Sequence, residues 1–240
     1  MTAHKADEAA AEAGCLGILM LHTRFPRPPG DVGHPGSWRM PVRFRTVEGA
    51  SPQRVVRERA AGLLQPFIEA GRALVDQGAR ALTTSCGFLV LFQRELAAAL
   101  PVPVWSSSLL ALPGLAAQCP GVITIDAAAL GPDHLRAAGA PADTPVQGLP
   151  AGGSLQRTLL GNLPTLDADA AQVEVVAAAR QLVRRHPQLR SLVLECTNLP
   201  PYARAVREAT GLPVHDITTL VHERWRRLDT APEPGSAPNP

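Results

Sequence analysis

Two stretches of the sequence, RALTTSCG at Arg80–Gly87 and RSLVLECT at Arg190–Thr197, specify the architecture. A shift of 110 residues aligns them, places Cys86 on Cys196 and pairs nine identical residues over positions 80–110. A Pro-Val dipeptide follows each cysteine at the same spacing. The chain therefore contains a duplicated strand–turn–helix–strand unit, whose period is too long for a solenoid.

The segments around these two copies alternate between short apolar runs and helical stretches. Leu16–Leu21 is a continuous apolar run, typical of a strand that is buried on both faces. Ser51 and Pro52 combine a helix N-cap with a proline at the first helical position. This alternation predicts an α/β fold with parallel sheets covered by helices on both faces. The other expected strands are 42–47, 80–85, 103–105, 122–126, 144–148, 189–195 and 213–216, and the expected helices are 52–78 with an interruption at Pro66, 88–100, 132–138, 167–186 and 201–209.

Composition excludes several classes of protein. Of the 23 Lys and Arg residues in this 240-residue chain only Lys5 is a lysine, so neither a pyridoxal phosphate enzyme nor a P-loop protein is expected. The arginines are spread along the chain and the net charge is +2, which does not resemble a nucleic-acid-binding surface. The apolar runs are shorter than the roughly 18 residues of a membrane span.

The four cysteines indicate reduced thiols. They are widely spaced and form no CxxC motif, so we expect no metal site of the zinc-ribbon type and no thioredoxin-like motif. Met1–Gly14 lacks the basic and apolar regions of a secretory signal. We therefore expect a cytoplasmic protein without structural disulfides.

Both duplicated cysteines follow an expected strand, and ligands of open parallel sheets bind beyond that end of the strands. The helix N-terminus after each turn favours a thiolate and can hold a carboxylate. We expect Cys86 and Cys196 to be catalytic, one removing a proton as thiolate and the other returning one as thiol. The expected substrate-binding residues are Thr84, Ser85, Gly87, Thr197 and Asn198 at the two turns and Arg24 in the loop 22–40, with His22, Asp31 and His215 as weaker candidates.

The two turns also resemble a known family. The run ECTNLP at Glu195–Pro200 resembles the glycine-Cys-Thr-His-x-Pro signature of glutamate racemases, and TSCG at Thr84–Gly87 resembles their first cysteine turn. Pro213–Asp216 is similar to the strand that returns to their first lobe. Over residues 14–228 the chain thus resembles the aspartate/glutamate racemase superfamily, which includes hydantoin racemases, arylmalonate decarboxylases and maleate isomerases.

This resemblance implies two pseudo-symmetric flavodoxin-like lobes with the active site between them and no cofactor. The first lobe would comprise residues 14–113 and the second 114–212, with 213–228 rejoining the first. Residues 1–13 and 229–240 would be flexible tails.

The resemblance implies an isomerase, a cofactor-independent racemase or epimerase of a small acidic amino acid or related carboxylate. Cys86 favours this two-cysteine chemistry, because arylmalonate decarboxylases keep only the second cysteine. The alternatives are a decarboxylase or cis–trans isomerase of a small dicarboxylic acid with Cys196 as the main catalytic thiol, a non-catalytic carboxylate-binding protein, and a protein with a redox-active disulfide. The expected partner is a small-molecule carboxylate, with no nucleic acid and no membrane, and a homodimer is the expected assembly if the chain associates.

Overall fold

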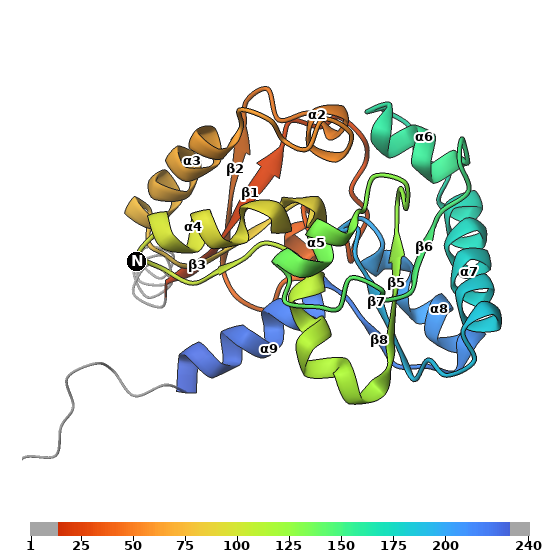
Figure 1. Cartoon of the computed structure of the whole chain (residues 1–240). Helices are drawn as coiled ribbons and strands as arrows, with labels where there is room; N and C mark the ends of the chain where they lie inside the picture. The colour runs from red at the N-terminus through yellow and green to blue at the C-terminus, as the bar shows by residue number, and fades with distance from the viewer. Residues whose placement is uncertain (1–13, 231–240) are drawn as a thin grey trace, which may run out of the picture.

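Two parallel four-stranded sheets, one in each lobe, form the frame of the molecule in the computed structural model, which describes residues 14–230 (Figure 1). Their strand orders, β2-β1-β3-β4 and β6-β5-β7-β8, are the same order repeated, as the duplicated sequence unit predicts. The expected two-lobed α/β fold is confirmed. The strands are β1 (Cys15–Leu21), β2 (Val42–Val47), β3 (Ala79–Thr84), β4 (Val104–Trp105), β5 (Pro120–Thr124), β6 (Val146–Gly148), β7 (Ser191–Leu194) and β8 (Val214–His215).

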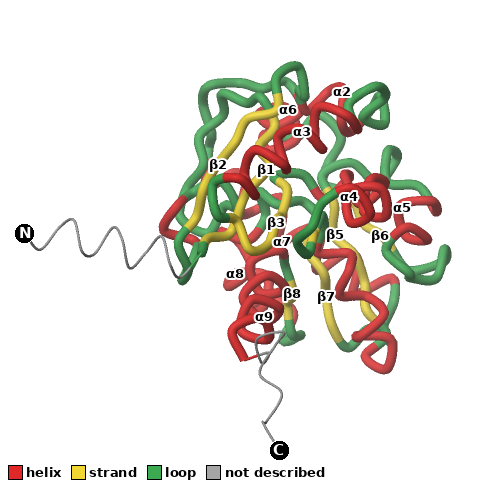
Figure 2. Tube along the Cα trace, turned by 90° about the vertical axis from the view of Figure 1, so that its left-hand side faces the viewer, coloured by secondary structure: helices red, strands yellow, loops and turns green. Residues whose placement is uncertain are grey.

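The connecting helices lie against the two sheets (Figure 2). Caps fix several of their ends: the Ser51 hydroxyl accepts the Arg54 N–H at the start of α2, and the Asp167 carboxylate accepts the Ala170 N–H at the start of α7. The α-helices are α2 (Pro52–Val56), α3 (Leu64–Asp76), α4 (Gln93–Ala99), α5 (Pro132–Ala137), α6 (Ser154–Leu160), α7 (Ala168–Arg185), α8 (Ala203–Thr210) and α9 (Ile217–Thr230), and the 3-10 helices are η1 (Pro35–Ser37), η2 (Gly87–Phe92), η3 (Ser108–Gln118) and η4 (Pro200–Tyr202).

The interior is divided between two apolar clusters. The larger cluster includes buried residues of both lobes, such as Leu82 and Leu192, so the lobes are packed on one another. The smaller cluster lies on one face of the first sheet, where Val221 and Trp225 of α9 are buried in the same cluster as Ile18 of β1.

The C-terminal strand differs from expectation. We expected residues 213–228 to rejoin the first lobe, but β8 pairs with β7 in the second sheet, with Val214 opposite Leu192. Only α9 packs on the first lobe. The duplication explains this pairing, since β4 and β8 occupy equivalent edge positions beside β3 and β7. Of the expected tails, residues 1–13 and 231–240 lie outside the described residues, and 229–230 complete α9.

The expected interruption at Pro66 is also misplaced. Pro66 lies in the first turn of α3, where the missing N–H needs no partner. The chain breaks earlier, at residues 57–63, where Arg59 and Ala60 have left-handed φ values of 57° and 54°.

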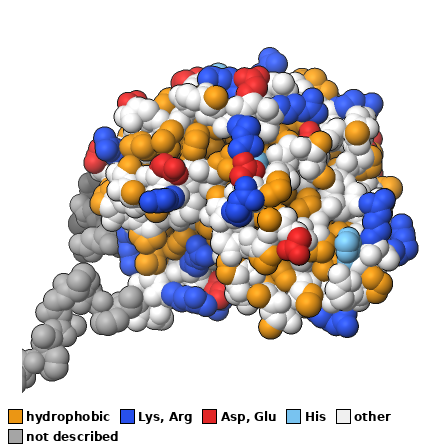
Figure 3. Space-filling model, viewed as in Figure 1, with side chains coloured by type: hydrophobic (Ala, Val, Ile, Leu, Met, Phe, Trp, Pro, Cys, Tyr) orange, Lys and Arg blue, Asp and Glu red, His pale blue; other side chains and the backbone are white. Residues whose placement is uncertain are grey.

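Two features of the exterior bear on partners. Within residues 14–230, none of the helices has both the length and the apolar character needed to cross a bilayer. Acidic and basic side chains lie interspersed among apolar ones over the face drawn in Figure 3.

Candidate active site

The two duplicated cysteines, one from each lobe, line a single cavity. Cys86 lies two residues beyond the end of β3, and Cys196 lies two residues beyond the end of β7. Both are buried, at 9% and 7% exposure. The cavity has a free volume of about 20 Å³, enough for about one water molecule. It is lined by Leu21, Phe25, Pro52, Val56, Ser85, Cys86, Gly87, Phe88, Ile125, Leu159, Leu160, Cys196, Thr197 and Asn198.

Hydrogen bonds tie the two cysteine turns to each other. The Thr197 hydroxyl donates to the Ser85 carbonyl at 2.7 Å, which joins the turns directly. The Ser108 hydroxyl of η3 donates to the Leu194 carbonyl at 2.7 Å and holds the end of β7. Thr84 has a supporting role, because its hydroxyl is fully buried and donates to the Ser106 carbonyl at 2.8 Å. Of the six residues expected to bind substrate, four line the cavity: Ser85, Gly87, Thr197 and Asn198. Thr84 and Arg24 are not among the lining residues.

The loop after β1 contributes a buried ion pair beside the second cysteine. Asp31, 1% exposed, accepts hydrogen bonds from Arg27 Nη1 at 2.8 Å and from Asn198 Nδ2 at 2.6 Å. Asn198 Oδ1 in turn lies 3.6 Å from Cys196 Sγ and accepts its S–H. The Arg27 guanidinium also covers the ring of Phe25, with 4.7 Å between guanidinium carbon and ring centroid. The loop thus orients the Asn198 amide and positions one wall of the cavity.

Arg24 is not at the site. It is exposed, and its backbone N–H donates to Asn162 Oδ1 in a separate hollow that His22 also lines. Arg27 is the loop arginine whose charge acts on Cys86. The sequence analysis missed Arg27, because the composition of an irregular loop does not show which of its arginines turns inward.

Burial dominates the acidity of both thiols. It raises the pKa of Cys86 and of Cys196, and the Glu195 carboxylate raises both further. Other neighbours distinguish the two thiols. The Arg27 charge lowers the pKa of Cys86, whereas the Asp31 charge raises that of Cys196. The surroundings therefore favour a thiolate at Cys86 over one at Cys196.

Glu195 is the second site residue that the sequence analysis did not single out. It is fully buried, and burial raises its pKa to about 8, although a hydrogen bond from the Thr124 hydroxyl to Oε2 at 2.7 Å acts in the opposite direction. The sequence did contain an indication of an unusual residue, because Glu195 occupies the position of the glycine in the racemase signature.

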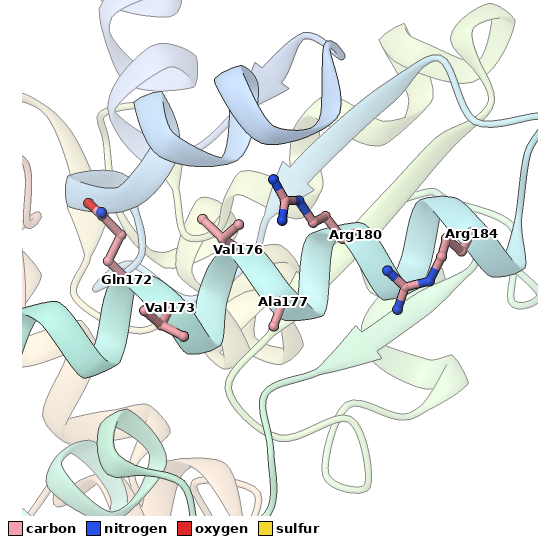
Figure 4. Close-up of a pocket in the computed structure, with 6 residues that line it drawn as sticks. All are labelled: Gln172, Val173, Val176, Ala177, Arg180 and Arg184. Atoms are coloured by element: carbon pink, nitrogen blue, oxygen red, sulfur yellow. The ribbon is translucent and has the colours of Figure 1, made fainter.

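A larger hollow of about 440 Å³ lies on the outer surface of α7, and all six of its lining residues come from that helix (Figure 4). Since it contains neither a thiol nor a carboxylate, we do not assign the chemistry to it. Residues 14–230 hold no group of three or more His, Cys, Asp or Glu side chains placed to bind a metal ion.

Comparison with solved structures shows which known proteins share this fold. Arylmalonate decarboxylase aligns with a TM-score of 0.61 at 16% identity, covering 93% of this chain and 94% of the other. Allantoin racemase from Pseudomonas fluorescens aligns with a TM-score of 0.53 at 18% identity, covering 93% and 100%. The resemblance to the aspartate/glutamate racemase superfamily is therefore confirmed for the fold.

Comparison with characterised sequences corrects the expected activity. No protein-family model matches the chain. A dimethylsulfoniopropionate lyase of Durusdinium sp. clade D is 30% identical over 212 residues, 84% of this chain and 70% of that protein. Dimethylsulfoniopropionate lyase 6 of Emiliania huxleyi (strain CCMP1516) is 31% identical over 247 residues, and the chain spans only 62% of its length.

These relatives are lyases, so the expectation of an isomerase that racemises an amino acid is wrong. The cysteine motifs predicted the fold, but a thiol motif does not specify the substrate or its leaving group, on which the class of reaction depends. At this identity and coverage, the chain belongs to the dimethylsulfoniopropionate lyase family, built on the aspartate/glutamate racemase superfamily fold.

Proposed function

We propose that the chain is a lyase that eliminates a sulfide from a small β-sulfonio carboxylate such as dimethylsulfoniopropionate. The observation that carries this proposal is a cavity lined by two thiols and otherwise mainly by apolar side chains. The names of the relatives supply the substrate class.

The proposed reaction needs one base and no cofactor. A thiolate removes a proton from the carbon next to the carboxylate, and the electrons of that C–H bond form the new C=C bond. The C–S bond breaks, and its electron pair leaves with sulfur as neutral dimethyl sulfide. Acrylate and a thiol remain, and loss of the thiol proton to solvent restores the thiolate. Because the sulfide leaves uncharged, no acid has to protonate it.

The base in this proposal is Cys86. The Arg27 charge favours its ionised form. A backbone N–H donates to each sulfur, from Phe88 to Cys86 and from Asn198 to Cys196, so these bonds do not distinguish the two thiols. The Cys196 thiol also donates to the side-chain oxygen of Asn198, an arrangement that retains its proton. The decarboxylase-like alternative assigned the main role to Cys196, and the charges beside the two thiols argue for the reverse.

The lining of the cavity suits a sulfonium carboxylate better than a dicarboxylate. No acidic or basic side chain is among the lining residues, and Phe25, Val56 and Ile125 offer an apolar surface to two methyl groups. Ser85 can bind the carboxylate, because its Oγ accepts the Leu21 N–H at 2.7 Å and its own hydrogen has no acceptor among the described residues. The Thr197 hydroxyl already donates its hydrogen to the Ser85 carbonyl, so we do not assign it to the carboxylate.

The cavity must widen before such a substrate enters. Its free volume of about 20 Å³ is far below that of a five-carbon substrate. The wall contains Phe25 from the loop after β1, Val56 of α2 and Leu160 of α6, and these two helices, one from each lobe, contact each other. We therefore propose that α2 and α6 separate when substrate enters.

The test is turnover in deuterated water, with dimethyl sulfide measured in the headspace and acrylate by proton NMR. The proposal predicts equal amounts of both products. Release of carbon dioxide from a dicarboxylate, or binding of dimethylsulfoniopropionate without any product, would overturn it. A small-carboxylate substrate, a homodimer and a cytoplasmic location remain predictions from the sequence.

A further inference from the structure

Glu195 has a carboxylate oxygen without a partner in a fully buried position. The side chain lies between the strand ends of the second sheet and the first cysteine turn. Its Oε2 accepts the Thr124 hydroxyl at 2.7 Å, whereas Oε1 is buried and has no hydrogen-bond partner in the part of the chain that the structure describes. The same oxygen closely approaches Gly87, where an added Cβ would lie 2.3 Å from it. Thr124 is on β5, which pairs directly with β7 (Figure 1).

The charge on Glu195 acts on both thiols. A carboxylate there raises the pKa of Cys86 and of Cys196, and in each case it is the largest influence after burial. The other charged groups near the thiols are Arg27, which acts on Cys86, and Asp31, which acts on Cys196. These two form an ion pair with each other, whereas Glu195 has no ion-pair partner among residues 14–230.

We propose that Glu195 is a positioning residue whose buried carboxyl group must be protonated for a thiolate to form beside it. This role rests on the proposed function, because it concerns the base of that reaction. Two negative charges in one buried, poorly solvated site are costly, so the site accommodates one. Glu195 and the thiols therefore compete for a single ionisation.

This competition gives a distinctive pH dependence. As pH rises the site loses one proton, most often from Glu195, whose pKa is about 8. A constant minor share of the singly ionised sites carries the charge on sulfur instead. The fraction of sites with a thiolate therefore increases up to about pH 8 and is constant above it. Without an ionisable group at position 195, thiolate would keep increasing with pH.

The experiment follows thiol ionisation without relying on lyase activity. The wild type and Glu195→Gln are alkylated with iodoacetamide between pH 6 and 10, and the rate at each cysteine is read by peptide mass mapping. Gln has the same length as Glu and can still accept from Thr124, but it carries no charge. Cys119 is exposed and provides an internal reference in both proteins.

We expect the alkylation rate at Cys86 to level off near pH 8 in the wild type and to keep rising in Glu195→Gln, with at least about a fivefold difference at pH 9. The rates at Cys119 should coincide. If iodoacetamide does not reach the buried thiols, the ¹³Cβ shifts of labelled cysteine report the same ionisations. Equal pH dependences at Cys86 in the two proteins would overturn the proposal.

Thr124→Val provides a second test with a predicted sign. Loss of the hydroxyl removes the hydrogen bond that lowers the pKa of Glu195, so the level region should begin at higher pH. An unchanged or lower onset would contradict the proposal. If the thiol curves separate as expected while no sulfide is released, the proposed function fails and the role of Glu195 stands.

Discussion

The side-chain amide of Asn198 donates to Asp31 Oδ2 at 2.6 Å, across 167 residues of sequence. This bond fastens the loop after β1 to the second cysteine turn, and a backbone bond from Val32 to the Thr197 carbonyl at 3.3 Å reinforces it. Since the oxygen of the same amide accepts the Cys196 S–H, the loop positions a hydrogen-bond partner of that thiol.

Replacing Asp31 with Asn should destabilise the fold strongly. The change leaves the Arg27 guanidinium, 12% exposed, without its anionic partner. Breaking a buried pair in this way costs about 3–5 kcal/mol. Urea unfolding measures the difference, with Glu208→Gln as control, because the Arg204–Glu208 pair is exposed. Equal midpoints for the two variants would show that the Asp31 pair is not a structural contact.

Gly87→Ala should disrupt the site. The new Cβ would lie 2.3 Å from Glu195 Oε1 and 2.4 Å from the Glu195 carbonyl oxygen, so the turn must shift. Overpacking of this kind costs about 1–3 kcal/mol. We expect a lower melting temperature and loss of sulfide release. Gly114→Ala is the matched control, since none of the described residues has an atom within 4 Å of its added Cβ, apart from its neighbours in the chain and helix. If both variants behave alike, the close approach of Gly87 to Glu195 has no consequence.

Ser85→Ala should weaken substrate binding. A hydrogen bond from a hydroxyl to a carboxylate contributes about 1.5–3 kcal/mol, which corresponds to roughly a 10- to 150-fold increase in KM. Steady-state sulfide release at several substrate concentrations measures it. Arg24→Ala should change KM less than about twofold, because Arg24 is exposed and outside the cavity. A larger effect at Arg24 than at Ser85 would restore the carboxylate-clamp role expected from the sequence.

Glu195 should also make stability depend on pH. Its pKa is raised from 4.5 to about 8 in the folded protein, so the unfolded chain releases this proton first. The contribution of Glu195 to stability therefore decreases as pH rises from about 4.5 to about 8 and is constant above that. The stability advantage of Glu195→Gln over the wild type should widen between pH 5 and pH 8, as measured by urea unfolding. A constant difference across that range would mean that Glu195 ionises normally.

The sequence predicted the fold well because the duplication is visible in it. The aligned cysteines located the ends of two strands, and the apolar runs located strands along the chain. The pairing of β8 was missed, since edge position depends on hydrogen bonds between strands rather than on local pattern. The burial of Glu195 arises from packing against Gly87, in a turn more than 80 residues earlier in the chain. Arg27 turns inward to pair with Asp31 of its own loop, and the loop pattern does not show that Asp31 is held by Asn198 of the distant second turn. The activity depends on the leaving group of the substrate, which no cysteine motif records.

The most direct measurement is dimethyl sulfide release from dimethylsulfoniopropionate by the wild type, Cys86→Ser and Cys196→Ser at one pH. A serine hydroxyl is a far weaker base than a thiolate, so Cys86→Ser should lose about 10²- to 10⁴-fold in kcat. Cys196→Ser should retain more activity, because its thiol keeps its proton in the proposed reaction. Full turnover by Cys86→Ser, or no sulfide from the wild type, would contradict a Cys86 thiolate lyase.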